Sequence, residues 1–111
     1  MPKNYRLTRA DFARMRGFKR LPGELFSLSY GAIPGRKMPG FACVVSAKAI
    51  ARASARNTVK RRCRAVFRRI VDTRHPLVYV YYAKKAAQSA PFGEVERDVR
   101  ALYARVHSPL A

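Results

Sequence analysis

One stretch of the sequence limits both what the chain can fold into and what it can bind: residues 48–71 hold nine of its 24 lysines and arginines and no acidic residue. Wound as an α-helix, at about 100° per residue, residues 56–71 gather their apolar side chains into one narrow stripe. The members of this stripe are Val59, Cys63, Val66, Phe67 and Ile70. The pattern predicts an amphipathic helix that docks on a core and leaves its other faces in solvent.

The face beside the apolar stripe is strongly cationic. Lys60, Arg64 and Arg68 recur every four residues, a spacing at which like charges repel, and no carboxylate in the stretch offsets them. A solvated charged face usually mixes both signs, so this pattern favours a nucleic acid as the partner. The residues that we expect to bind it lie on this helix and just before it: Lys48, Arg52, Arg56, Asn57, Lys60, Arg61, Arg64 and Arg68.

Composition excludes some classes of protein. The chain has 111 residues, a net charge of +18 and 49% apolar residues, which is too apolar for a disordered basic tail and fits a single RNA-binding domain over residues 1–111. The charge alone fits RNA, DNA or an anionic membrane. No apolar run is long enough to cross a membrane and the N-terminus lacks a signal peptide, so we expect a cytoplasmic protein without a membrane partner. Without a helix–turn–helix or dimerisation heptads, we expect no DNA partner.

Periodicity along the rest of the chain predicts a small α+β fold. We expect helices over residues 7–17, over the basic stretch as far as 72–75 and over 92–106, and strands over 25–31, 41–47 and 77–82. Thr8 and Asp11 fit a capping box at the first helix. Residues 31–40, rich in glycine and proline, should form a hairpin loop, and Leu-Pro-Gly at 21–23 a turn. The order α-β-β-α-β-α predicts a two-layer sandwich of helices on one small sheet.

The acidic residues and histidines form no pattern typical of a protein-based nuclease centre. Six carboxylates are scattered along the chain, and three of them, Glu94, Glu96 and Asp98, suit the start of a helix better than a metal. The two cysteines and two histidines match no zinc-binding spacing, and we expect Cys43 and Cys63 to be buried thiols. The sequence therefore predicts no catalytic residue and no metal ligand in the polypeptide.

Residues 55–64, Ala-Arg-Asn-Thr-Val-Lys-Arg-Arg-Cys-Arg, resemble the signature helix of the bacterial ribonuclease P protein component. That signature runs approximately Arg-Asn-Arg-x-Lys-Arg-x-x-Arg, and the chain departs from it at Thr58, where the family usually has arginine. Val-Ser-Ala-Lys at 45–48, Ala-Lys-Lys-Ala-Ala at 83–87 and Asp-Phe at 11–12 are similar to other motifs of the family, in the family's order.

The resemblance implies the function of a ribonuclease P protein subunit. In that enzyme a catalytic RNA subunit removes the 5′ leader of precursor tRNA endonucleolytically, giving the mature 5′ end. The reaction depends on Mg²⁺, which is bound mainly by the RNA. The polypeptide is then expected to bind ribonuclease P RNA and precursor tRNA, to assist RNA catalysis and to be inactive alone.

The resemblance also implies a fold and a second set of binding residues. The fold is similar to the second domain of ribosomal protein S5, with a small mixed sheet and a left-handed βαβ crossover. The single-stranded leader is expected in a cleft between the first helix and one face of the sheet. By position, Phe12 and Tyr30 are the leader-binding candidates, and Ser29 matches the family as well as Tyr30 does.

A second function fits the charge and the expected fold almost as well: a ribosomal protein that binds ribosomal RNA structurally. The spacing of Arg56, Asn57, Lys60, Arg61 and Arg64 separates the two functions. Together with the matching flanks, this spacing favours the ribonuclease P protein.

Overall fold

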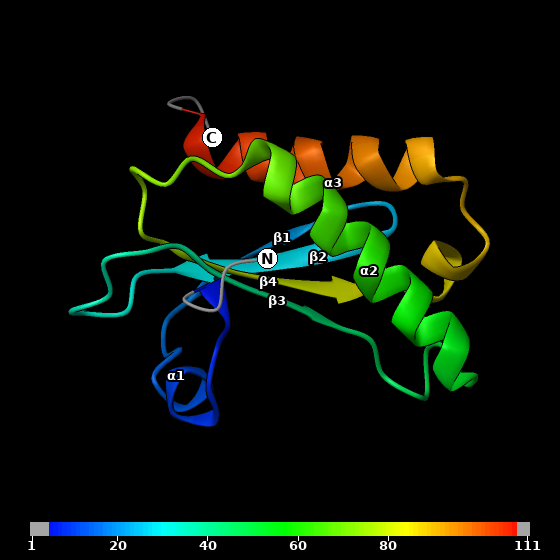
Figure 1. Cartoon of the computed structure of the whole chain (residues 1–111), viewed down its shortest axis with the longest axis horizontal. Coiled ribbons are helices and arrows are strands. Elements are labelled where there is room, and N and C mark those ends of the chain that lie inside the picture. Colours follow the sequence, from blue (N-terminus) through cyan, green and yellow to red (C-terminus); the bar gives the residue numbers. More distant parts are fainter. Residues whose placement is uncertain (1–4, 109–111) are drawn as a thin grey trace.

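The computed structural model describes residues 5–108, which form three α-helices, a short 3-10 helix and a four-stranded sheet (Figure 1). The helices are α1 (Arg9–Ala13), α2 (Ala53–Ile70), the 3-10 helix η2 (Lys85–Gln88) and α3 (Phe92–His107). The strands are β1 (Lys19–Pro22), β2 (Phe26–Gly31), β3 (Gly40–Val44) and β4 (Val78–Ala83). Within residues 5–108, none of the helices is long and apolar enough to cross a membrane.

The sheet is mixed and has the strand order β1-β2-β4-β3. β4 pairs antiparallel with β2 and parallel with β3, and its buried residues confirm the central position that its apolar sequence predicts. The predicted α+β fold, with helices packed on a small mixed sheet, is confirmed. β3 and β4 are the parallel strands that α2 connects.

Two predictions about the sheet are wrong. Residues 31–40 do not close a hairpin, because β4 lies between β2 and β3 and takes the hydrogen bonds that the hairpin would have made. The turn expected at 21–23 is displaced by one additional strand, β1, in which Leu21 pairs with Leu28 and packs against the core. The chain then reverses after β1, where Gly23 N donates to Phe26 O at 2.8 Å.

The two faces of the sheet have different environments. α2 and α3 lie across one face, and α1 lies on the other side (Figure 1). Because side chains alternate along a strand, Phe26 and Leu28 face the helices while Ser27 and Ser29 face the opposite way. We call this second side the open face; it includes the side chains of Arg20, Ser27, Ser29, Val80 and Tyr82.

The core lies between the sheet and α2. Phe67 stacks on Phe41, with ring centroids 4.6 Å apart, and meets Tyr79 at 5.3 Å. Four of the five predicted stripe residues of α2 are fully buried and Ile70 is partly buried, which confirms the predicted rotation of the helix. α2 is therefore fixed by one apolar face.

The cysteines belong to the same core. Cys63 is buried, as predicted, whereas Cys43 is only partly buried, and both are free thiols. Burial, supported by a hydrogen bond with Cys43, raises the pKa of the Cys63 thiol. Cys63 is consequently a packing residue with a protonated side chain.

α1 is short but well defined at its start. Thr8 N donates to Asp11 Oδ2 at 2.8 Å and Asp11 N donates to Thr8 Oγ1 at 3.1 Å, so the predicted capping box is confirmed. The helix ends at Ala13 rather than near Gly17, which has a positive φ of 72°. Arg36 lies 3.6 Å from Asp11 and ties α1 to the long connection after β2.

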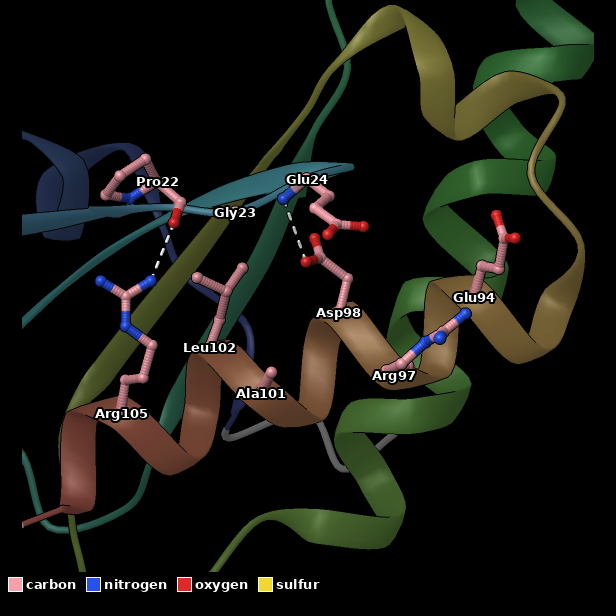
Figure 2. A pocket seen from close by; sticks show the side chains of 9 residues that line it. All are labelled: Pro22, Gly23, Glu24, Glu94, Arg97, Asp98, Ala101, Leu102 and Arg105. Carbon is pink, nitrogen blue, oxygen red and sulfur yellow. Dashed lines mark hydrogen bonds between the residues drawn. The ribbon is translucent and has the colours of Figure 1, made fainter.

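A carboxylate on α3 holds the turn between β1 and β2. Asp98 accepts hydrogen bonds from three consecutive backbone N–H groups, those of Glu24, Leu25 and Phe26, at 2.9–3.1 Å. Figure 2 shows Asp98 reaching the turn from α3, with Arg105 donating to Pro22 O nearby at 2.8 Å. A Cβ atom on Gly23 would lie 2.6 Å from Phe26 O and 3.0 Å from the Asp98 carboxylate, so only glycine fits.

We predict that Asp98→Asn lowers the free energy of unfolding by about 1–3 kcal/mol, because an amide group would turn donors toward the three backbone N–H groups. Glu94→Gln is the matched control, since Glu94 lies on the same helix and lines the same pocket. Denaturant unfolding measures both variants. Equal stabilities would contradict a clamp at Asp98.

Candidate nucleic-acid interface

The exposed surface of α2 and the segment before it present most of the predicted RNA-binding residues to solvent. Six of the eight are exposed: Lys48, Arg52, Asn57, Arg61, Arg64 and Arg68. Lys60 is half-buried where α2 meets the edge of the sheet. We call the five members on the helix, Asn57, Lys60, Arg61, Arg64 and Arg68, the basic face of α2.

The side chains of the basic face have no partner within the described part of the chain. None of them makes a hydrogen bond or an ion pair with a residue between 5 and 108. Arg62 and Arg69, on the other side of α2, do have partners: Arg62 donates to Ala90 O at 3.4 Å and Arg69 lies 4.0 Å from Glu96. The structure thus separates cations that hold α2 against α3 and the segment before it from cations that are available to a ligand.

Arg56 is bound to the backbone of the protein itself, although the sequence predicts it to be an RNA-binding residue. Its Nη1 donates to Ile50 O at 2.9 Å and to Ala51 O at 2.7 Å. The N-cap residue Arg52 makes no side-chain cap, so Arg56 is the side chain that closes the loop leading into α2. Thr58, where the family usually has arginine, donates its hydroxyl to Ser54 O at 3.0 Å and adds no charge.

Sequence reasoning missed one residue of this interface, Arg6. Its backbone forms a parallel bridge with Phe41 of β3, the strand at the edge of the sheet. Paired residues in a sheet point to the same side, so the bridge directs Arg6 toward the face that α2 covers. There Arg6, Lys60 and Arg64 line one cavity of about 420 Å³ that has no acid in its wall.

No pattern within the sequence signals this contact. Arg6 precedes the first helix and lies far from the basic stretch, and only the pairing with β3 brings the two together. A shift of one residue in that pairing would turn Arg6 to the opposite face.

The two leader-binding candidates lie on different sides of the sheet. Phe12, on α1, is 40% exposed and is the only large apolar side chain of residues 5–108 with that much exposure. Tyr30 is partly buried against the core that α2 and α3 cover. Ser29, the alternative match, points to the open face. The structure therefore brings Ser29, and not Tyr30, to the side of the sheet on which α1 lies.

The carboxylates of the described residues have structural partners or lie apart. Hydrogen bonds from Arg74 hold the pKa of Asp72 well below its usual range, Asp11 caps α1, and Arg100 binds Glu96 at 3.1 Å. Within residues 5–108, no group of three or more His, Cys, Asp or Glu side chains could hold a metal ion.

The histidines lie together at the far end of α3. His107 Nε2 lies 2.7 Å from the Tyr79 hydroxyl, and its ring packs beside His75. Burial, and then the nearby His75, lower the pKa of His107. These contacts join α3 to β4 and place the histidines in the packing of the fold.

Comparison with known proteins identifies the same family as the motif. A family profile described as Ribonuclease P matches residues 1–107. The fold resembles that of the Staphylococcus aureus RNase P protein, with a TM-score of 0.81, 18% identity, and coverage of 92% of this chain and 94% of that chain. It also resembles the Thermotoga maritima RNase P protein, with a TM-score of 0.75, 24% identity, and coverage of 90% and 96%. Among curated proteins, no sequence matches significantly.

Replacing Lys60, Arg61 and Arg64 together with alanine should weaken the binding of ribonuclease P RNA, because it removes three cations that have no partner in residues 5–108. Each lost phosphate contact should reduce the slope of log K against log salt by about 0.7–0.9. Arg69→Ala is the matched control, since Arg69 lies on the same helix near Glu96. A triple variant with the parental slope would show that this face does not bind RNA.

Arg56→Ala should affect stability first. Two carbonyl groups before α2 would lose their donor, and we expect the free energy of unfolding to fall by about 1–2 kcal/mol. Arg61→Ala removes the same charge from an exposed position and should leave stability unchanged. Denaturant unfolding of the two variants tests this; equal losses would contradict the structural role of Arg56.

Proposed function

The chain belongs to the ribonuclease P family, and we propose that it is the protein subunit of ribonuclease P, which binds the catalytic RNA and the 5′ leader of precursor tRNA. The basic face of α2 is the observation that carries the proposal. It presents cations without carboxylates and without protein partners in residues 5–108, on a helix whose opposite side is fixed in the core. Such a surface suits the phosphates of a folded RNA.

The contact with the catalytic RNA is proposed to extend beyond α2. Arg6 shares a cavity with Lys60 and Arg64 at the edge of β3, so a phosphate that meets the helix there also meets the N-terminal segment. Arginine forks and a lysine around one concave site are suited to a phosphate oxygen. Lys48 and Arg52 continue the cationic surface before the helix.

The leader is proposed to bind on the open face of the sheet, near α1. Single-stranded RNA is held by stacking of its bases on planar side chains, with cations along its backbone. Phe12, on α1, offers an exposed aromatic ring beside this face. None of the four strands contains an acidic residue, so the sheet does not repel a polyanion.

Catalysis is proposed to reside in the RNA subunit. The residues of 5–108 do not fit Mg²⁺, because they gather no metal-binding group of three or more acidic, histidine or cysteine side chains. The Mg²⁺ ions are therefore assigned to the RNA. The contribution of the protein is electrostatic: a net charge of +18 reduces the repulsion between a polyanionic substrate and a polyanionic catalyst.

Reconstitution with ribonuclease P RNA tests the proposal. The protein should strongly increase single-turnover cleavage of precursor tRNA at low Mg²⁺, and the increase should shrink as Mg²⁺ rises, because divalent ions then supply the same screening. It should also shrink for a substrate whose leader is cut to about one nucleotide, because the contacts of the leader with the protein are lost.

The protein alone is the control in this experiment and should not cleave. Two results would overturn the proposal. One is cleavage by the protein alone that disappears when a particular carboxylate is replaced. The other is a holoenzyme whose rate is independent of the protein at every Mg²⁺ concentration.

A further inference from the structure

One arginine on the open face is held by side chains of two neighbouring strands. Arg20 lies on β1, where it pairs with Ser29 of β2. Its Cζ atom lies 4.4 Å from the centre of the Tyr82 ring on β4. Its Nη2 donates a hydrogen bond of 2.8 Å to Ser27 Oγ on β2. The guanidinium is thus fixed by an aromatic ring beneath it and a hydroxyl beside it.

The register of the sheet dictates this arrangement. Ser27 and Tyr82 are direct partners across β2 and β4, so their side chains emerge on the same side. Arg20 pairs with Ser29, two residues along β2 from Ser27, and is therefore close enough to reach the side chains of Ser27 and Tyr82. The three side chains form one unit across three strands.

The unit leaves a planar surface available. Tyr82 covers one face of the guanidinium, and Arg20 as a residue remains exposed. Ser27 is 8% exposed and is the one buried polar residue of the described chain, so its hydroxyl is committed to Arg20 rather than to solvent. The side of the guanidinium turned away from the Tyr82 ring is consequently a cationic surface that faces solvent.

The surroundings favour a nucleobase over a phosphate on this plane. The nearest part of the open face is apolar, with Val80 and Tyr82 in one cluster with Phe18. A guanidinium that lies on an aromatic ring keeps its planar side for stacking, and RNA bases stack on both aromatic rings and arginine planes. A phosphate is better bound by the edge of the guanidinium, where the N–H groups are, and Ser27 already occupies part of that edge.

We propose that Arg20, supported by Tyr82 and Ser27, is a stacking platform for one unpaired base of the precursor tRNA leader. This inference rests on the proposed function, because it assigns a residue to the leader that the protein subunit is proposed to bind. It adds a contact on the sheet, in β1, that is separate from the aromatic ring of Phe12 on α1. Because every base has a planar face, the platform is expected to bind bases of any kind.

The experiment compares two precursor tRNAs with the reconstituted holoenzyme: one with a natural leader and one whose leader has abasic sites throughout. Both leaders carry the same phosphates, so the ratio of their affinities isolates the contribution of the bases. Arg20→Lys keeps the charge and removes the plane, and Tyr82→Leu removes the support. The controls are Tyr82→Phe, which keeps the ring, and Lys19→Gln, which removes a neighbouring cation from the opposite side of β1.

Arg20→Lys should weaken binding of the natural leader by about 5-fold to 100-fold, the range that stacking of one base gives, and should leave binding of the abasic leader unchanged. Tyr82→Leu should do the same, and the two controls should keep the parental ratio. The double variant Arg20→Lys with Tyr82→Leu removes the plane and the ring together and should behave like Arg20→Lys alone. Thermal unfolding of each variant verifies that the sheet is intact.

Three results would overturn the platform. If Arg20→Lys weakens both leaders equally, Arg20 binds a phosphate. If Arg20→Lys keeps the parental ratio and only the double variant loses it, the base stacks on Tyr82. If the parent itself does not distinguish the two leaders, the protein reads no leader base. In all three cases the holoenzyme still cleaves, whereas a holoenzyme that gains nothing from the protein would mean that the proposed function fails as well.

Discussion

The packing of α2 on the sheet is the interaction on which the rest of the structure depends. Phe67 stacks on Phe41 and meets Tyr79, and Val59, Cys63 and Val66 complete a fully buried face. Burial of side chains of this size contributes about 1.5–3 kcal/mol each. That contribution offsets the repulsion among cations that repeat along the exposed side of the same helix without a carboxylate between them. A helix held by one face can leave its opposite side unneutralised.

The few carboxylates of the chain are used where they stabilise the fold most. Asp98 satisfies three backbone N–H groups in the turn between β1 and β2, and Asp11 completes the cap of α1 while lying 3.6 Å from Arg36. Glu96 lies near both Arg69 and Arg100 on the side of α3. None of these groups faces the basic face of α2. The result is a charge separation in which the cations outside the packing contacts are the ones exposed to a ligand.

The sequence predicts what is local in this fold and fails where distant segments meet. The apolar stripe, the capping box at Thr8 and the central position of β4 follow from periodicity and side-chain type, and all are confirmed. The pairing of β4 between β2 and β3 does not follow from periodicity. Alternation along a strand shows which residues share a face, but it does not show which strand is the neighbour. β1 was missed for the same reason, because its last residue, Pro22, and the following Gly23 are typical of a turn.

The predicted binding residues also divide into those that follow from local pattern and those that depend on contacts between distant segments. Alternation correctly grouped Phe26, Leu28 and Tyr30 on one face, but only the positions of α2 and α3 show that this face is the covered one. Within the signature motif, Arg56 binds the carbonyl groups of Ile50 and Ala51, and Thr58 bonds back to Ser54. Two positions at the start of the motif are therefore engaged with the protein itself. Within α2, the cations without a partner in residues 5–108 begin at Lys60 and continue toward Arg68, with Arg6 beside them across the edge of β3. The proposed RNA surface consequently runs from Lys48 and Arg52, before α2, to Arg68 near its end, and Arg6 joins it at the edge of the sheet.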